Sequence, residues 1–344
     1  MSTLQISLAV AGGLVLAGIV AHSAWSSRKN APRQAEPPIE PTQSDAAIEQ
    51  REPVLDTLAS LESSSHTATE RRPGLDAVID VIATINLEGP IYGELALHAM
   101  PPTRRAGSKP FAIEGQNLDT LHWELPVAGQ RYGVFQAGVQ MANRMGALNE
   151  IEYSEFVMKA QAFADAINGA PEFPEMLEAV SHARELDQFA SAHDAHLSFS
   201  LRALSSAWSP GYIHQCAGRL GFVPGVIPGR LVLPSSEMGL PPILSLVFDA
   251  QAALAQDPDQ SAVREVALTL EVPHVDRAER PFVQLRETAQ ALATVMDGVV
   301  TDDAGQPLPS DAMDQIGSEL EQLYDALDAR DFSAGSPLAR RLFS

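Results

Sequence analysis

The clearest alternation of apolar and polar residues lies in the last third of the chain. Residues 265–272, with the sequence EVALTLEV, place apolar side chains at every second position, and a period of two predicts a half-buried strand. Apolar residues then recur every three or four positions over 281–298, which predicts an amphipathic helix that begins at a proline and ends at a glycine. A short strand at 299–300 and a final helix over 310–327 complete this part.

The preceding segment adds four elements to the same pattern. Alternation predicts a strand over 197–203, and Ser209-Pro210 is a typical helix start for a helix reaching residue 220. Strands are predicted at 226–233 and 243–248. The order strand, helix, three strands, helix, strand, helix predicts an α+β fold, in which a sheet carries helices on one face.

A weaker copy of this pattern precedes it. Residues 160–169 (AQAFADAING) parallel residues 289–298 (AQALATVMDG), and Asp76-Ala77 precedes a predicted strand as Asp194-Ala195 does 118 residues later. We interpret these matches as two tandem related units, 74–192 and 193–330, followed by an exposed tail at 331–344. The alternative is that any alanine-rich amphipathic helix after a strand produces such a match.

The N-terminus carries one long apolar segment. Ile6–Trp25 is 20 residues without an acidic or basic side chain, and a helix of that length spans the roughly 30 Å hydrocarbon core of a bilayer. Positive charge follows the segment at Arg28, Lys29 and Arg33, which predicts a single-pass membrane anchor (1–28) with the remaining chain in the cytoplasm. A cleaved signal peptide would need a basic stretch before the apolar run, and a lipoprotein a cysteine after it, whereas Cys216 is the only cysteine.

Residues 29–73 have the composition of a disordered linker. They are rich in proline, serine, glutamate and glutamine and contain no aromatic residue, so they cannot bury enough apolar surface to offset the entropy of ordering. A flexible chain of about 44 residues has an average reach of roughly 35–40 Å. The linker therefore predicts a tethered domain that searches a volume beneath the membrane.

The overall charge narrows the function classes. A net charge of −21 excludes nucleic acid as a partner, because a polyanion would be repelled, and disfavours contact with anionic lipid. The sites we considered lack the spacing that chemistry needs. His193 and His196 have no third metal ligand at a usual distance in the sequence, and the glycine-rich segment 218–230 lacks the Gly-Lys-Ser/Thr ending of a phosphate loop. We therefore expect no metal, no cofactor, no small-molecule substrate and no enzymatic activity.

Several short motifs resemble the ZipA family, the membrane-anchored bacterial cell division proteins that bind FtsZ. The motifs are Leu270-Glu271-Val272-Pro273, Phe282, Ala289-Gln290 and residues 297–303 (DGVVTDD), together with Gly221-Phe222 and Gly225. They cover roughly 193–330, and the order of anchor, proline-rich linker and α+β domain also matches. The resemblance implies that the chain anchors FtsZ filaments of the Z ring to the inner membrane at the septum, through a C-terminal domain that binds the FtsZ C-terminal tail.

The resemblance also implies a groove on the helix-free face of the sheet. Its positions fall at His196, Ser198, Ile227, Gly229, Val247, Asp249, Ala267 and Thr269. Family members present bulky apolar side chains there, whereas Ser198, Asp249 and Thr269 are small or polar and would contribute little apolar burial. Three explanations remain open: the tail sits differently, Val78 and Ile82 of the first unit contribute, or the protein is a membrane-anchored scaffold for a different division or envelope protein.

Overall fold

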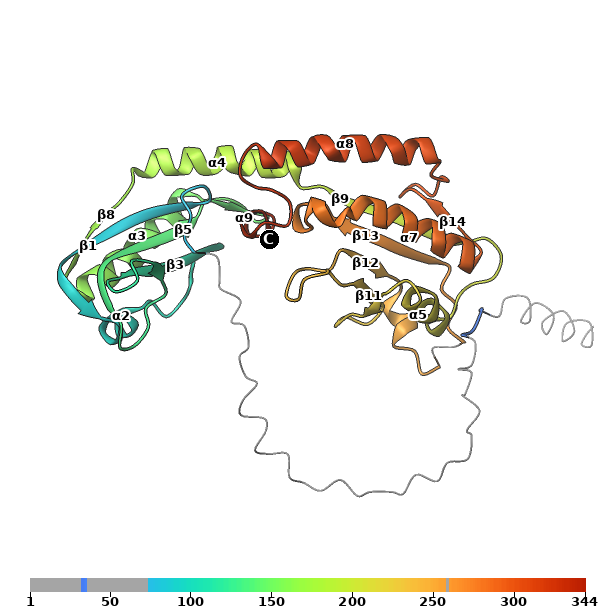
Figure 1. Cartoon of the computed structure of the whole chain (residues 1–344), viewed down its shortest axis with the longest axis horizontal. Helices are drawn as coiled ribbons and strands as arrows, with labels where there is room; N and C mark the ends of the chain where they lie inside the picture. The colour runs from blue at the N-terminus through green and yellow to red at the C-terminus, as the bar shows by residue number, and fades with distance from the viewer. Residues whose placement is uncertain (1–31, 36–73, 258–259) are drawn as a thin grey trace, which may run out of the picture. The chain divides into compact units, whose positions relative to one another are not determined.

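The structure is a computed structural model that describes residues 32–35, 74–257 and 260–344 (Figure 1). It confirms the α+β class: the described residues form sheets and eight α-helices. The predicted anchor, 1–28, and nearly all of the predicted linker, 29–73, lie outside these residues. Within the described ranges, none of the helices combines the length and the apolar character that crossing a bilayer demands.

The described residues form two compact units. One, here called the β9 unit, contains 32–35, 196–271 and 278–319; the other, the β1 unit, contains 74–195, 272–277 and 320–344. The chain therefore enters the β9 unit, leaves it for the β1 unit and returns. Its last 25 residues belong with the β1 unit.

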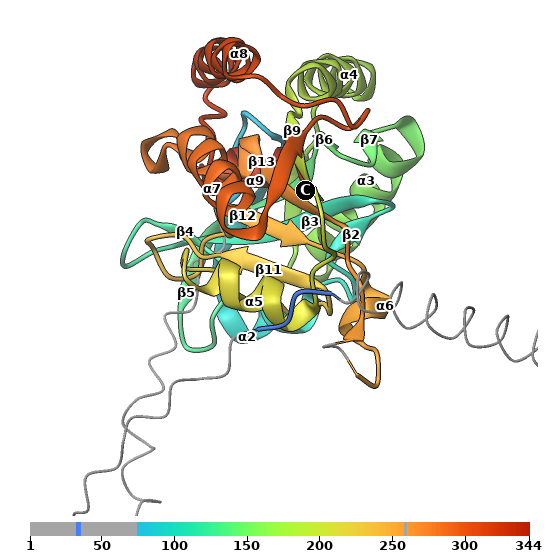
Figure 2. The same cartoon turned by 90° about the vertical axis from the view of Figure 1, so that its right-hand side faces the viewer.

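The β9 unit is a six-stranded antiparallel sheet with the order β10-β11-β12-β13-β9-β14. Helix α7 packs on β13, β9 and β14, while α5 packs against α7 and β10 (Figure 2). The bounds are β9 (His196–Ala203), α5 (Pro210–Gly218), β10 (Val223–Pro224), β11 (Arg230–Leu233), β12 (Leu244–Val247), α6 (Ala250–Ala253), β13 (Glu265–Glu271), α7 (Pro281–Met296) and β14 (Gly298–Thr301). Helix α8 (Ser310–Asp328) begins in this unit, and its residues from 320 on belong to the β1 unit. Short 3₁₀ turns follow β13 at Val272–His274, which belongs to the β1 unit, and at Arg277–Glu279.

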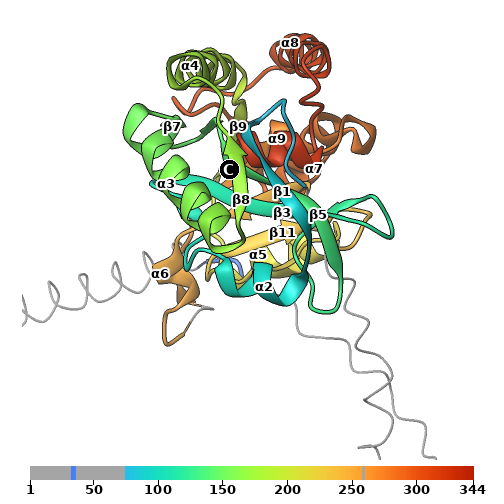
Figure 3. The ribbon, with the colours of Figure 1, turned by 90° about the vertical axis from the view of Figure 1, so that its left-hand side faces the viewer.

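The β1 unit has a second antiparallel sheet with the order β2-β3-β5-β1-β8, and β4 also pairs with β3 (Figure 3). Helix α3 packs against strands of this sheet, and α4 packs against α3 and the small hairpin β6–β7. The bounds are β1 (Asp80–Tyr92), α2 (Gly93–Ala99), β2 (Arg105–Ala106), β3 (Lys109–Asn117), β4 (Trp123–Glu124), β5 (Arg131–Gln140), β6 (Ala142–Asn143), β7 (Gly146–Ala147), α3 (Glu150–Ala166), β8 (Gly169–Glu172), α4 (Met176–His193) and α9 (Pro337–Leu342).

The two sheets share one topology. When β1, β3, β5 and β8 are matched to β9, β12, β13 and β14, the strand orders coincide, and α3 corresponds to α7. A residue with positive φ follows each helix, Asn168 after α3 and Asp297 after α7, and it stands immediately before a glycine that begins the next strand. Because Leu87 pairs with Gly169 as Ala203 pairs with Gly298, the first strands are offset by 116 residues and the Asp-Ala pairs, 118 apart, are not equivalent.

Period-two burial explains why the predicted strands form. Val266, Leu268 and Leu270 of β13 are buried, and Phe199 of β9 packs edge-on against Phe282 of α7. The strand predicted at 265–272 and the helix predicted from Pro281 are thus confirmed within a residue or two. The helix stops one residue earlier than expected, since Asp297 and not Gly298 adopts the left-handed conformation.

Two predictions are wrong. The strand predicted at 226–233 is a hairpin, in which β10 and β11 flank a turn whose Val226 is fully exposed. The tail at 331–344 is ordered and packed: Leu342 and Phe343 are buried, and Ser336 caps α9 by accepting a hydrogen bond from the Ala339 N–H. Proline at the first position of α9 and its buried apolar side explain why this segment forms a helix that packs into the β1 unit.

Candidate partner-binding site

The face of the β9-unit sheet opposite α7, called here the second face, is built from cross-strand pairs. Val247 lies opposite Ala267, and Thr269 lies opposite both Ser198 and Ser245. Because side chains directly opposite each other in a sheet point to the same side, these residues share one surface. The structure therefore brings together five of the eight predicted groove positions: His196, Ser198, Val247, Ala267 and Thr269.

The apolar part of the second face is small. Val247 is 38% exposed, and its neighbours on the face are the half-buried Val232 and Ala267. Serine and threonine fill the centre, where the Thr269 hydroxyl donates to the Ser245 carbonyl at 3.3 Å. The face thus offers a narrow apolar strip beside a row of hydroxyl groups.

Arg230 is a member of this face that the sequence patterns did not single out. It pairs with Val247 across β11 and β12, and its Nη2 donates to the Ser245 hydroxyl at 2.9 Å. Its Nε is buried and, among the described residues, has no hydrogen-bond acceptor. A buried donor without an acceptor costs free energy, but this Nε is enclosed by the protein, so a bound group can contact Arg230 only at the accessible part of its half-buried side chain. No signal in the local sequence separates this arginine from an ordinary surface residue.

The other three predicted positions lie off the face. Ile227 and Gly229 belong to the turn before β11, where Gly229 has φ +77° and its carbonyl accepts the Phe248 N–H. Asp249 caps the short helix α6 by accepting the Gln251 N–H at 2.8 Å. These three residues close and orient the β11–β12 end of the sheet and leave the binding surface to the strands.

The equivalent face of the β1 unit has different chemistry. Its side chains include Glu114, which accepts a hydrogen bond from Gln136 at 2.9 Å, and Asn86, which donates to Glu172 at 2.9 Å. Leu75 lies over Gly138, since a Cβ built on that glycine would come within 2.4 Å of the leucine side chain. Polar pairs and the leucine occupy the face that the β9 unit leaves to small and apolar side chains.

The two first-unit residues considered for the groove do not act together. Val78 sits in the turn that precedes β1, with its N–H donated to the Asp76 carboxylate at 2.9 Å. Ile82 is half-buried in β1, opposite Gly138. Only Ile82 belongs to the sheet surface.

The histidines considered for a metal have structural surroundings. His193 is the last residue of α4, where its Nδ1 lies 2.7 Å from the Phe189 carbonyl and its ring packs on the Phe189 ring at 4.3 Å between centroids. His196 begins β9 opposite Glu271. Across the ranges that the structure describes, no group of three potential metal ligands is found.

Part of the β9 unit matches a known family model. Residues 251–319 match the family model described as ZipA, C-terminal FtsZ-binding domain; the matched segment includes β13, α7 and β14. A search of the curated proteins finds no match. The match confirms that the C-terminal part of this chain resembles the ZipA family, in the segment that carries Ala267 and Thr269 of the second face.

Proposed function

We propose that the chain is a non-enzymatic cell division protein that binds the FtsZ C-terminal tail on the second face of the β9 unit. The observation that carries the proposal is the match of 251–319 to the FtsZ-binding domain of ZipA, a segment that supplies the central strand β13 of that face. The face has the two features that peptide recognition needs: an apolar strip for burial, and polar groups that fix orientation.

The chemistry of the face favours a partner that is both apolar and acidic. Val247 and Ala267 offer apolar contact, while the half-buried Arg230, opposite Val247, offers a cationic group on the same face. In a chain with a net charge of −21, such a local cation is a specific attraction for a carboxylate. We expect Arg230→Gln to weaken tail binding and to reduce its salt dependence, because a charged contact is lost.

Two valines provide a matched test of the binding face. Val247 on the second face is 38% exposed, and Val283 on α7 is 37% exposed. Burying a whole valine contributes about 1.5–3 kcal/mol, so covering the exposed part of Val247 contributes about 0.6–1.1 kcal/mol, and an aspartate there adds the cost of desolvating a charge. Val247→Asp should therefore weaken the binding of a fluorescent FtsZ tail peptide by about tenfold or more, and Val283→Asp should leave it within about twofold.

The measurement is fluorescence anisotropy on the full chain in lipid nanodiscs. Equal losses for both variants would point to a general effect of the added charge and not to this face. Absence of saturable binding by the unaltered chain at submillimolar peptide would remove FtsZ as the partner.

The membrane part of the proposal rests on Ile6–Trp25 as a single inner-membrane span that leaves the folded units in the cytoplasm. Many weak tail contacts along one filament would then hold the filament to the membrane through avidity. Fusion of a reporter enzyme behind Ser344 tests this orientation: activity confined to the periplasm would overturn it.

The second candidate is a membrane-anchored scaffold for a different division or envelope protein. The hydroxyl-rich centre of the face, with Ser198, Ser245 and Thr269, favours it. Under this alternative Val247→Asp still disrupts the binding of the true partner, but the FtsZ tail peptide does not bind.

A further inference from the structure

A short segment far upstream of the sheet is part of the β9 unit. Arg33 forms a parallel β-bridge with Trp208: the Arg33 N–H donates to the Ala207 carbonyl at 2.7 Å, and the Ser209 N–H donates to the Arg33 carbonyl at 2.9 Å. Trp208 in turn bridges Val263 in the antiparallel sense, with bonds of 2.8 and 2.9 Å. Arg33 thus adds a third backbone segment to a small ladder at this end of the unit.

The side chain of Arg33 has its own partner. Its Nη2 lies 3.2 Å from the Asp297 Oδ2, a carboxylate that also accepts the Ser205 hydroxyl. Asp297 is the left-handed residue that follows α7, and its backbone N–H donates to the Ala293 carbonyl at the helix end. Burial raises the pKa of the nearby Tyr212, and the Arg33 guanidinium opposes that increase.

Two contacts fix the backbone of residues 207–209, to which Arg33 is bonded. Trp208 is completely buried, and its indole N–H donates to the Met296 carbonyl at 2.7 Å. Ser209 caps α5 by accepting the Tyr212 N–H at 3.1 Å. The backbone of 207–209 is therefore fixed between the indole and a helix start, and it presents a preformed edge to an extended strand.

We propose that residues 32–34 dock in cis on the 207–209 edge and Asp297, so that the β9 unit is held next to the membrane rather than at the end of the long linker. Only the seven residues 26–32 separate the predicted span from the docked arginine. Fully extended, the eight residue steps from Trp25 to Arg33 cover at most about 26–29 Å. Residues 36–73 then connect the docked strand to the β1 unit and add nothing to the reach of the β9 unit.

Under this proposal the linker has a different role from the one that its composition predicts. A domain on a free linker of about 44 residues would have an average reach of roughly 35–40 Å and a far longer maximum. Docking reduces the tether of the β9 unit to the seven residues, 26–32, that precede Arg33. The proximity to the membrane rests on the proposed anchor, whereas the docking itself does not.

Because the chain has a single cysteine, its removal leaves only the introduced cysteines to carry spin labels. In a Cys216→Ala background, nitroxide labels at Ala35→Cys and at the exposed Leu204→Cys report docking by pulsed electron spin resonance on the full chain in nanodiscs. We expect one narrow distance distribution. Arg33→Glu, which places a second carboxylate beside Asp297, should broaden it severalfold, and Arg51→Glu, an identical charge change elsewhere, should leave it narrow.

A second label pair, Ser27→Cys with Leu204→Cys, reports the tether length. This distribution should also be confined in the unaltered chain and broaden with Arg33→Glu. A broad 35–204 distribution in the unaltered chain, or one that Arg33→Glu does not change, would overturn the docking. FtsZ tail binding measured on the same sample separates the two ideas: lost tail binding with a narrow distribution refutes the proposed function alone, and retained tail binding with a broad distribution refutes the docking alone.

Discussion

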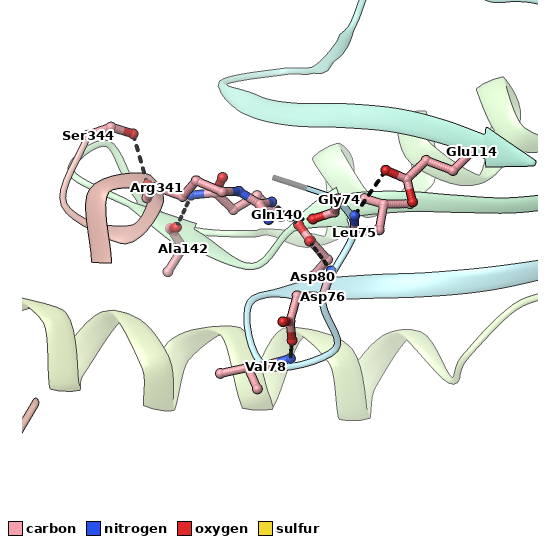
Figure 4. A network of polar contacts seen from close by, with 10 residues as sticks. All are labelled: Gly74, Leu75, Asp76, Val78, Asp80, Glu114, Gln140, Ala142, Arg341 and Ser344. Atoms are coloured by element: carbon pink, nitrogen blue, oxygen red, sulfur yellow. Dashed lines mark hydrogen bonds and ion pairs between the residues drawn. The ribbon is translucent and has the colours of Figure 1, made fainter. Parts of the chain in front are cut away.

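Substitution of Arg341, in the C-terminal helix α9, tests how the β1 unit is stabilised. Its guanidinium pairs with Asp80 at the start of β1 and donates to the Gly74 carbonyl at 3.3 Å (Figure 4). The Arg341 carbonyl accepts the Gln140 side-chain amide at 2.9 Å. The Asp80 carboxylate also accepts the Asp76 N–H at 2.9 Å. The side chains of Asp80 and Arg341 are 1% and 18% exposed, so water cannot replace the guanidinium if Asp80 loses it.

Arg341→Met keeps the bulk of the side chain and removes its charge. Breaking a buried pair from one side costs about 3–5 kcal/mol, because the remaining charge is uncompensated. We therefore expect the free energy of unfolding of the β1 unit to fall by about that amount at pH 7. Asp80→Asn combined with Arg341→Met removes both charges and should recover most of the lost free energy of unfolding. The reason is that the attraction within a buried ion pair does little more than offset the cost of removing both charges from water.

The titration of Asp80 gives the pH dependence of this stability loss a definite sign. Burial raises the pKa of Asp80, and Arg341 lowers it by hydrogen bonding and by charge, with burial the larger effect. A carboxyl whose native pKa lies above its unfolded value binds more protons when folded, so its contribution to stability falls as the pH rises through that window. Without Arg341 the native pKa rises further. The free energy of unfolding that Arg341→Met loses relative to the unaltered chain should accordingly shrink as the pH falls and Asp80 becomes protonated.

Hydrogen exchange with mass spectrometry is the assay, because it reports each unit separately. Amides of β1 and β5 should lose protection in Arg341→Met, while those of β9 and β13 keep theirs. Arg340→Met, in the same helix, leaves Asp80 paired and should have a small effect. A loss below about 1 kcal/mol, or equal losses of protection in the two units, would refute the argument that α9 closes the β1 unit through this ion pair.

Two further predictions concern the β1 unit. Lys109 is fully buried, and its Nζ donates to the Asn143 side chain at 2.8 Å. Burial lowers the pKa of Lys109, so the unfolded state binds more protons than the native state. The free energy of unfolding should therefore rise as the pH rises toward the ordinary lysine pKa of about 10.4. Urea midpoints at several pH values should show that rise in the unaltered chain but not in Lys109→Met, and parallel curves would contradict it. Gly138→Ala places a Cβ 2.4 Å from Leu75 and should cost about 1–3 kcal/mol, whereas Gly89→Ala, with no atom within 4 Å, should stay within about 0.5 kcal/mol in the same urea assay.

The sequence predicts those parts of the fold that local burial determines. Strand β13 and helix α7 follow from apolar side chains at periods of two and of three to four, because each buries its apolar side against the other. The start of α5 follows from Ser209, whose hydroxyl caps the helix. The second-face positions on β9 and β13 follow from the same alternation.

What the sequence does not predict depends on contacts between distant segments. Arg341 pairs with Asp80 across a separation of 261 residues, and Arg33 pairs with Asp297 across 264 residues. No local sequence pattern marks either pair. The C-terminal segment resembles a frayed end by composition, but its apolar side chains are buried in the β1 unit. Ile227 and Asp249 were assigned to the groove by resemblance, but a turn and a helix cap place them beside the sheet.

The two units share one topology but differ on the sheet face that lies away from the main helix. In both, the face toward the main helix is apolar, with Phe135 packed on Phe163 in one unit and Phe199 on Phe282 in the other. The β1 unit covers its opposite face with Leu75 and with side-chain pairs such as Glu114 and Gln136. The β9 unit keeps Val247 partly exposed beside the half-buried Arg230. A partner gains most where apolar surface is still available for burial, so we expect the proposed tail binding on the β9 unit and not on the covered face of the β1 unit.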